Sequence, residues 1–215
     1  EPALLAHNVN TWLHKSTENR MVRTLENGNY FARAILSDRY MPIDNDVILE
    51  TALSVLHNHG EYQVVSAEVT DRRLYLCVVS KKLEGEVRKG EVVQQGIVFG
   101  NSEVGLGSFF ANPFLYILSC TNGAIMESAL RRHHVGKRIE EDYDVYSPDT
   151  IKIDQLSFLM KVRDVVSSSF DELKFRDMLG KVALTADRKI VRTDLADVVQ
   201  DVTKKFDLSV DEGNS

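Results

Sequence analysis

A run of basic side chains at residues 131–138 offers the clearest chemistry in the sequence. It reads Arg-Arg-His-His-Val-Gly-Lys-Arg, so four permanent positive charges and two histidines fall within eight residues. Cations at this density suit phosphate oxygens, because each neutralised phosphate releases condensed counterions. The alternative is that the cluster ends a helix, whose C-terminus favours cations, and pairs with the acidic residues that follow from Glu140 onward. The pattern leaves polyanion binding and internal charge pairing both open.

Aromatic residues stand beside further cations in the part of the sequence that favours β-strands. Arg72 and Arg73 lie in a predicted turn next to Tyr75. Sites for single-stranded nucleic acid combine cations that follow the phosphate backbone with aromatic rings that stack on bases. The competing interpretation is solvated surface charge, with the aromatic rings in the core. The predicted nucleic-acid contacts are Arg33, Arg39, Tyr40, Arg72, Arg73, Tyr75, Arg131, Arg132, Lys137 and Arg138.

A glycine-rich segment at residues 100–107 follows a predicted strand and reads Gly-Asn-Ser-Glu-Val-Gly-Leu-Gly. It lacks the Gly-Lys-Ser/Thr ending of a phosphate-binding loop. Its glycine spacing also differs from the dinucleotide-binding fingerprint. Glycine permits a positive φ or a close approach of the backbone, so the segment is either a structural bulge or a turn that faces a ligand.

Cys120 and the pair His57 and His59 are the remaining candidates for catalysis or metal binding. A nucleophilic cysteine needs a neighbouring base. The sequence places no histidine beside Cys120, which favours a buried and inert thiol. No second pair of cysteine or histidine residues stands at ligand spacing from His57 and His59. We therefore predict no catalytic residue, no metal and no cofactor, and we favour a protein that is not an enzyme.

Apolar periodicity divides the first 120 residues into one helix and several strands, after a mostly helical or extended arm at residues 1–27. An apolar face at 3.6-residue spacing ends at Gly60, where a glycine suits a helix terminus. The hairpin turn falls at residues 70–73. The pattern predicts strands at 30–36, 62–69, 74–79, 92–99 and 108–121, a helix at 45–59 and a polar loop at 81–91.

Later in the sequence the pattern changes towards helices. Because proline has no backbone N–H to donate, the stretch around Pro113 is expected to be an edge strand, a bulge or a broken strand. From Gly123 a helical period predicts a helix that ends near Gly136 and carries the basic cluster at its C-terminus. An acidic linker follows, and three amphipathic helices complete the chain, the second and third capped by Asp171 and Thr193.

These elements predict an α+β fold, with an antiparallel β-sheet meander, a packed helix and a helical C-terminal extension. The chain then divides into three parts. They are an N-terminal arm at 1–27, an α+β core domain at 28–138 and an acidic helical extension at 139–215.

The charge distribution bears on the partner. The 215 residues carry a formal net charge of −6. Residues 1–138 hold fifteen basic and fifteen acidic residues, so the whole surplus of negative charge belongs to residues 139–215. Net charge therefore does not exclude DNA.

No stretch approaches the roughly 18 apolar residues of a membrane span, no signal-peptide pattern opens the chain, and two cysteines suit a reducing compartment. We expect a cytoplasmic protein with no membrane partner.

Three segments, residues 34–45, 101–105 and 120–123, read Ala-Ile-Leu-Ser-Asp-Arg-Tyr-Met-Pro-Ile-Asp-Asn, Asn-Ser-Glu-Val-Gly and Cys-Thr-Asn-Gly. In this order they resemble the phage- and plasmid-borne family known as domain of unknown function 932, over roughly residues 20–210. The resemblance implies a mobile genetic element and no enzymatic activity that can be carried over. It marks as family positions Asn101, Ser102, Glu103, Gly105, Asn122 and Gly123.

The expected architecture is also similar, more distantly, to the Rad-type single-strand annealing proteins of phages, which hold single strands in a basic groove of a ring or filament. Fold analogy alone does not establish function. Our leading hypothesis is an oligomeric, non-enzymatic DNA-binding protein of a mobile element that binds single strands and anneals them in recombination. One alternative is an interaction protein that binds a host defence or replication factor through its acidic region. The second is a hydrolase or nucleotide-binding enzyme that uses Asn101, Ser102, Glu103 and Cys120.

Overall fold

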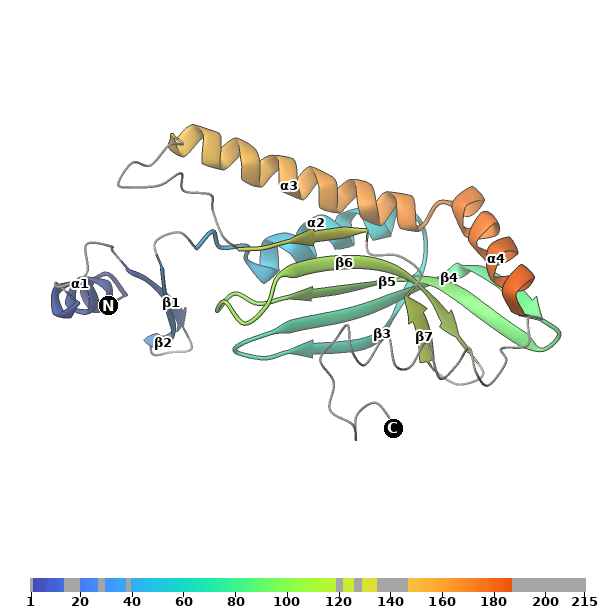
Figure 1. The fold of residues 1–215 in the computed structure, drawn as a ribbon, viewed down its shortest axis with the longest axis horizontal. Helices are drawn as coiled ribbons and strands as arrows, with labels where there is room; N and C mark the ends of the chain where they lie inside the picture. Colours follow the sequence, from blue (N-terminus) through green and yellow to red (C-terminus); the bar gives the residue numbers. More distant parts are fainter. Residues whose placement is uncertain are drawn as a thin grey trace, which may run out of the picture.

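The computed structural model describes residues 2–13, 20–26, 30–37, 40–118, 122–125, 129–134 and 147–186. Its strands form two antiparallel sheets, and its helices lie outside them (Figure 1). This confirms the predicted α+β class. The elements are α1 (Pro2–Trp12), β1 (Arg20–Glu26), β2 (Tyr30–Ser37), α2 (Asn45–Asn58), β3 (Tyr62–Val69), β4 (Leu74–Arg88), β5 (Glu91–Asn101), β6 (Phe109–Ile117), β7 (Asn122–Ile125), β8 (Leu130–Arg132), α3 (Pro148–Ser169) and α4 (Glu172–Ala186).

The larger sheet has the strand order β3-β4-β5-β6-β7, and β8 pairs with the same edge of β6 as β7 does. The smaller sheet is the β1–β2 hairpin, and α1 packs against it. From here on, N-terminal arm means α1, β1 and β2 together. Every pairing is antiparallel. The predicted strands and the hairpin between residues 69 and 74 are confirmed.

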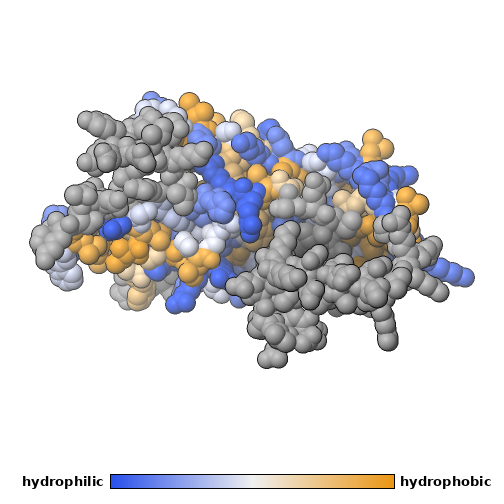
Figure 2. Space-filling view, in the orientation of Figure 1, coloured by the Kyte–Doolittle hydropathy of each residue, from blue (hydrophilic) through white to orange (hydrophobic). Residues whose placement is uncertain are grey.

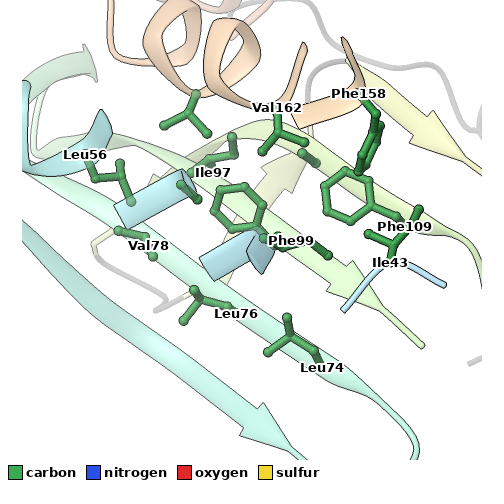
Figure 3. Packing of buried hydrophobic residues seen from close by; sticks show 14 of the residues in the cluster. Ile43, Leu56, Leu74, Leu76, Val78, Ile97, Phe99, Phe109, Phe158 and Val162 are labelled. Carbon is green, nitrogen blue, oxygen red and sulfur yellow. The ribbon is translucent and has the colours of Figure 1, made fainter. Parts of the chain in front are cut away.

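One face of the larger sheet carries the main core, beneath α2 and α3 (Figure 3). The predicted apolar face of α2 is buried through Ile48, Ala52 and Leu56. From α3, Phe158 and Val162 pack onto the same cluster, which includes Ile97, Phe99 and Phe109 of the sheet. Burying each such side chain contributes about 1.5–3 kcal/mol to folding. The described part of the C-terminal segment therefore shares its core with the sheet.

Local capping explains where the helices begin and end. Gly60 has a φ of 112°, a left-handed conformation that suits glycine after α2. The Ser147 side chain accepts a hydrogen bond from the Thr150 amide at the start of α3. The predicted cap of the next helix is confirmed, because the Asp171 carboxylate accepts a hydrogen bond of 2.9 Å from the Lys174 amide.

The predicted polar loop at 81–91 is wrong, because β4 continues to Arg88 and the turn to β5 spans only Lys89 and Gly90. The alternation of half-buried and exposed residues explains why this segment is a strand. Leu83 and Val87 are half-buried against α4, and a Cβ on Gly85 would lie 2.4 Å from Leu179. Charged residues between them face away, so the high polarity marks a strand with one covered face.

The predicted helix at 123–136 is also wrong where the structure describes it. Residues 122–125 and 130–132 form β7 and β8 instead, both antiparallel to β6. The helical period rested on three residues, whereas pairing satisfies the backbone groups along the edge of β6. The first two arginines of the basic cluster therefore lie on a strand, and a helix C-terminus does not account for their charge.

Pro113 occupies the position in β6 that best tolerates a residue without an amide proton. On one side it is paired with Ile97 of β5. On the other side β7 pairs with residues 114–117 and β8 with residues 109–111, so Pro113 falls between them. The predicted strand is confirmed over Phe109–Ile117, with its proline at an interruption of the edge.

Several predictions lie outside the described residues, namely the turn at 27–29, most of the acidic linker, the helix capped by Thr193, and the environment of Cys120. Among the described helices, none has the length and apolar character needed to cross a membrane.

Candidate functional site

Two of the three segments that carry the family resemblance, residues 34–45 and 101–105, meet at one end of the larger sheet. The described part of the third segment pairs with the opposite end of β6. The Tyr40 hydroxyl donates a hydrogen bond of 2.9 Å to the Ser102 carbonyl. The Asn101 side chain donates to the Ile43 carbonyl and to the Asn45 side chain, both at 2.8 Å. These bonds fasten the start of α2 to the end of β5. These two segments therefore share a structural task.

Glu103 links two further elements to this junction. One carboxylate oxygen accepts from the Asn45 amide at 2.8 Å, in the first turn of α2. The other lies 2.7 Å from the Arg33 guanidinium of β2, and both side chains are largely buried. A carboxylate suits a helix N-terminus, where backbone amides lack partners. The predicted loop at 100–107 therefore acts as a structural connection at Glu103.

The same loop holds the tip of the β3–β4 hairpin. The Ser102 hydroxyl donates to the Arg72 carbonyl at 2.8 Å and accepts from the Leu106 amide at 3.1 Å. Arg33 donates to the Asp71 carbonyl at 2.9 Å. Gly105 has a φ of 79°, which favours glycine in this tight loop. The hairpin backbone is thereby fixed, while the side chains of Arg72 and Arg73 remain exposed.

Five directly paired residues cross the sheet beside this junction, and we call them the end row. They run from β3 through β4, β5 and β6 to β8, and they are Glu68, Tyr75, Gly100, Phe110 and Arg131. Directly paired residues of an antiparallel sheet project from the same face. Their neighbours in sequence, among them Leu74, Phe99 and Phe109, pack under the helices. The end row therefore projects from the opposite face.

All five residues of the end row line a groove of about 430 Å³, which we call the end-row groove. Tyr75 is 42% exposed there. A Cβ on Gly100 would lie 2.2 Å from a ring carbon of Phe110, so the Phe110 ring lies over the glycine backbone. The groove thus presents the Tyr75 ring and, over the neighbouring glycine backbone, the Phe110 ring.

Cations flank these rings. Arg73 and Arg131 are exposed and line the groove, and Arg131 donates to the Ser108 hydroxyl at 3.1 Å. Burial, and to a lesser degree the nearby Cys77 thiol, raises the pKa of the Tyr75 phenol, so the phenol stays neutral near neutral pH. Glu68 places a carboxylate at one edge. The groove can therefore accept a planar group against its aromatic rings and anionic groups at its two arginines.

The structure gathers three of the predicted contact residues in this groove, namely Arg73, Tyr75 and Arg131. Arg72 is exposed on the adjacent hairpin tip. Sequence reasoning missed Glu68, Gly100 and Phe110. The only sequence signal for them was the aromatic and glycine content of the strands, because their alignment depends on a register that runs through five strands.

Three other predicted contacts have partners inside the fold. Arg33 is paired with Glu103 as described. Tyr40 is 7% exposed, and its ring stacks on His134 with centroids 5.1 Å apart. Arg132 forms an ion pair with Asp154 and lies 4.7 Å above the Phe158 ring. Arg39, Lys137 and Arg138 lie outside the described residues.

The remaining family positions are placed as far as the described residues allow. Asn122 and Gly123 open β7, where they pair with Ile117 and Tyr116. Within the described ranges, no group of three His, Cys, Asp or Glu side chains could hold a metal ion. His59 lies 3.0 Å from the Ser167 hydroxyl, which gives that imidazole a partner on α3.

Comparison with family models, with curated proteins and with solved structures found no match to this chain. The resemblance described above therefore remains an expectation, and the groove has to be interpreted from its own geometry.

Proposed function

We propose that this protein binds single-stranded DNA in the end-row groove and that it acts without catalysing a reaction. The observation that carries the proposal is the alignment of Tyr75 and Phe110 across Gly100, with Arg73 and Arg131 on the groove wall. Base stacking on one aromatic ring is worth about 1–3 kcal/mol. Each neutralised phosphate adds a contribution that depends on salt.

A single strand suits this groove better than a duplex. The exposed Tyr75 ring can be covered only by a base whose face is free, and duplex bases are stacked on both faces. A volume of about 430 Å³ also accommodates one or two nucleotides rather than a helix. We therefore propose a preference for single strands.

We keep as nucleic-acid contacts only those predicted residues that line or adjoin the groove, and we add Phe110 and Glu68. Arg73 and Arg131 bind phosphate, Tyr75 and Phe110 stack on bases, and the exposed Arg72 adds charge at the hairpin tip. Arg33, Tyr40 and Arg132 are left out because their partners lie within the fold. The carboxylate of Glu68 can accept hydrogen bonds from exocyclic amino groups of bases.

We also propose that copies of the chain associate, as an annealing protein of a mobile element would. The support is the N-terminal arm, where Trp12, Phe31 and Ile35 are 81%, 54% and 53% exposed. Hydrophobic surface gathers over this arm (Figure 2). Exposed apolar patches of this kind mark interaction sites. Sedimentation velocity of the full chain, with and without an oligonucleotide, checks this part of the proposal.

Anisotropy of a labelled oligonucleotide tests the groove. We expect binding at moderate salt, tighter for the single strand than for the duplex of the same sequence. Tyr75→Ala should weaken single-strand binding by about 1–3 kcal/mol, because it removes one stacking ring. Tyr75→Phe retains the ring and should bind like the unaltered protein. Equal affinity of Tyr75→Ala and Tyr75→Phe, or no binding at all, would contradict the proposal.

A further inference from the structure

A second hollow lies on the other face of the sheet, between α4, the C-terminal half of α3, and strands β5 and β6. Its volume is about 820 Å³, which falls in the range of small-molecule sites. Most of its wall is apolar and includes Pro113, Val165, Phe175 and Met178. It shares no lining residue with the end-row groove.

The placement of α4 creates this cavity. Phe175 anchors α4 against Val93 and Leu115 of the sheet, and Leu83 and Val87 of β4 complete that contact. The chain turns at Phe170 and Asp171, so α4 diverges from α3 (Figure 1). The space between the two helices and the sheet is the cavity.

One polar side chain in the cavity wall lacks adequate hydrogen bonds. Gln95 is 1% exposed and occupies a helix-facing position of β5, in the alternating series that continues with Ile97 and Phe99 of the core. Its amide nitrogen has a single long contact, 3.4 Å to the carbonyl of neighbouring Gly96. Its Oε1 accepts no hydrogen bond from the described residues.

A buried carboxamide without partners is costly, and native proteins almost always satisfy such groups. A leucine or methionine would fill the Gln95 position without that cost. The side chain therefore points to a partner that the described residues do not supply.

We propose that this cavity binds a small, mostly apolar and neutral molecule with adjacent N–H and C=O groups, as in a lactam or a secondary amide. The N–H of that edge donates to Gln95 Oε1, and its carbonyl accepts from Gln95 Nε2. The charged residues of the wall are balanced, with Lys174 and Lys181 against Asp164 and Asp177. The wall therefore favours a neutral ligand.

A matched pair of probes tests this complementarity on the full chain. The probe 2-quinolinone carries the required edge, whereas 2-methoxyquinoline has nearly the same shape without the N–H donor. Ligand-observed NMR titration should show 2-quinolinone binding about tenfold more tightly, the value of one hydrogen bond. Gln95→Met should abolish that difference. Met178→Trp, which fills the cavity and leaves Gln95 in place, should abolish binding of both probes.

Thermal melting without any probe gives an independent readout. Gln95→Met should melt at a higher temperature than the unaltered protein, because the thioether removes a buried and unpaired amide. Gln63→Met, the same exchange at an exposed position of β3, should leave the melting temperature unchanged. Oligonucleotide binding should survive Gln95→Met. A failure of the ligand proposal for this cavity can therefore be distinguished from a failure of the proposed DNA binding.

Three results would overturn the inference. They are a lower melting temperature for Gln95→Met, equal affinity of the two probes for the unaltered protein, and absence of 2-quinolinone binding. The first would mean that the fold already satisfies the Gln95 amide. The second and third would mean that the amide edge is not what the cavity recognises.

Discussion

Gly100 shapes the end-row groove through the side chain it lacks. It stands between Tyr75 and Phe110 in the register of β4, β5 and β6, and the Phe110 ring covers its backbone. Any Cβ at this position would meet that ring at 2.2 Å. The Phe110 ring can rotate away because it ends a flexible side chain. A substitution at Gly100 should therefore change the shape of the groove more than the stability of the fold.

Gly100→Ala should therefore weaken single-strand binding by about 1–2 kcal/mol, within the range for one stacked base, because the displaced Phe110 ring no longer lies beside Tyr75. Fluorescence anisotropy with the labelled oligonucleotide measures the loss. Gly180→Ala is the matched control, since nothing lies within 4 Å of a Cβ there. Unchanged affinity of Gly100→Ala would show that the aromatic row does not carry binding.

His134 is the residue whose ionisation should affect stability. Its imidazole is buried and stacked on Tyr40, with Nδ1 3.3 Å from the Met41 carbonyl. Burial lowers the pKa of this imidazole. The Met41 carbonyl opposes that shift, and the charges of Arg132, Arg23 and His133 add to it.

A pKa lowered by folding means that the unfolded chain takes up a proton that the folded chain does not. The free energy of unfolding should therefore fall as the pH drops below the usual imidazole value of 6.5. His134→Phe retains the stacking and should reduce this dependence. Urea denaturation over a pH series measures it. The same slope in the variant would contradict the buried, neutral imidazole.

At the scale of elements, local pattern was enough for α2, β3 and β5, because their apolar spacing and flanking turns agree with their packing. It failed where a distant element decides the structure. Every second residue from Lys82 to Arg88 is charged, and α4 covers the residues between them. Residues 122–125 and 130–132 are strands because β6 offers an unpaired edge. Neither partner can be recognised from a local window of sequence.

α3 also departs from the expected arrangement, since the sheet and α3 share one core. Phe158 meets Phe109 edge to face, with ring centroids 5.1 Å apart, and it lies beneath the Arg132 guanidinium. Phe158→Ala should lower the free energy of unfolding by about 3–5 kcal/mol, as for other buried phenylalanines.

Urea denaturation of Phe158→Ala provides the measurement. Leu156→Ala, two residues away on the exposed side of α3, is the control and should change stability by about 0.5 kcal/mol or less. Equal effects of the two substitutions would mean that α3 does not belong to the core.

At the scale of the molecule, the charge distribution becomes more specific once the fold is known. Residues 147–186 contain six acidic and six basic residues, so the described part of the C-terminal segment is neutral. The surplus of negative charge belongs to residues 139–146 and 187–215. The hypothesis of an acidic surface for a host protein therefore concerns residues outside the described part and stays a prediction.

The candidate site shows the same limit of sequence reasoning. Paired cations beside Tyr75 were visible in the sequence, and they do lie in one groove with Arg131. Phe110 and Gly100 join them only through a register that runs across β4, β5, β6 and β8. Arg33 and Arg132 are equally cationic in the sequence, yet Glu103 and Asp154 neutralise them in the fold.

We propose above all that Arg73 and Arg131 bind the phosphates of a single strand. The most direct measurement is the salt dependence of oligonucleotide affinity for Arg73→Glu combined with Arg131→Glu. Arg88→Glu combined with Lys89→Glu is the control, because it makes the same charge change at the opposite end of β4. We predict that the Arg73→Glu and Arg131→Glu double variant binds more weakly than the unaltered protein. Its slope of log affinity against log salt concentration should be shallower than that of the unaltered protein by at least about 1.4 units. The control should keep the original slope. Identical slopes for the two double variants would show that Arg73 and Arg131 do not bind phosphates.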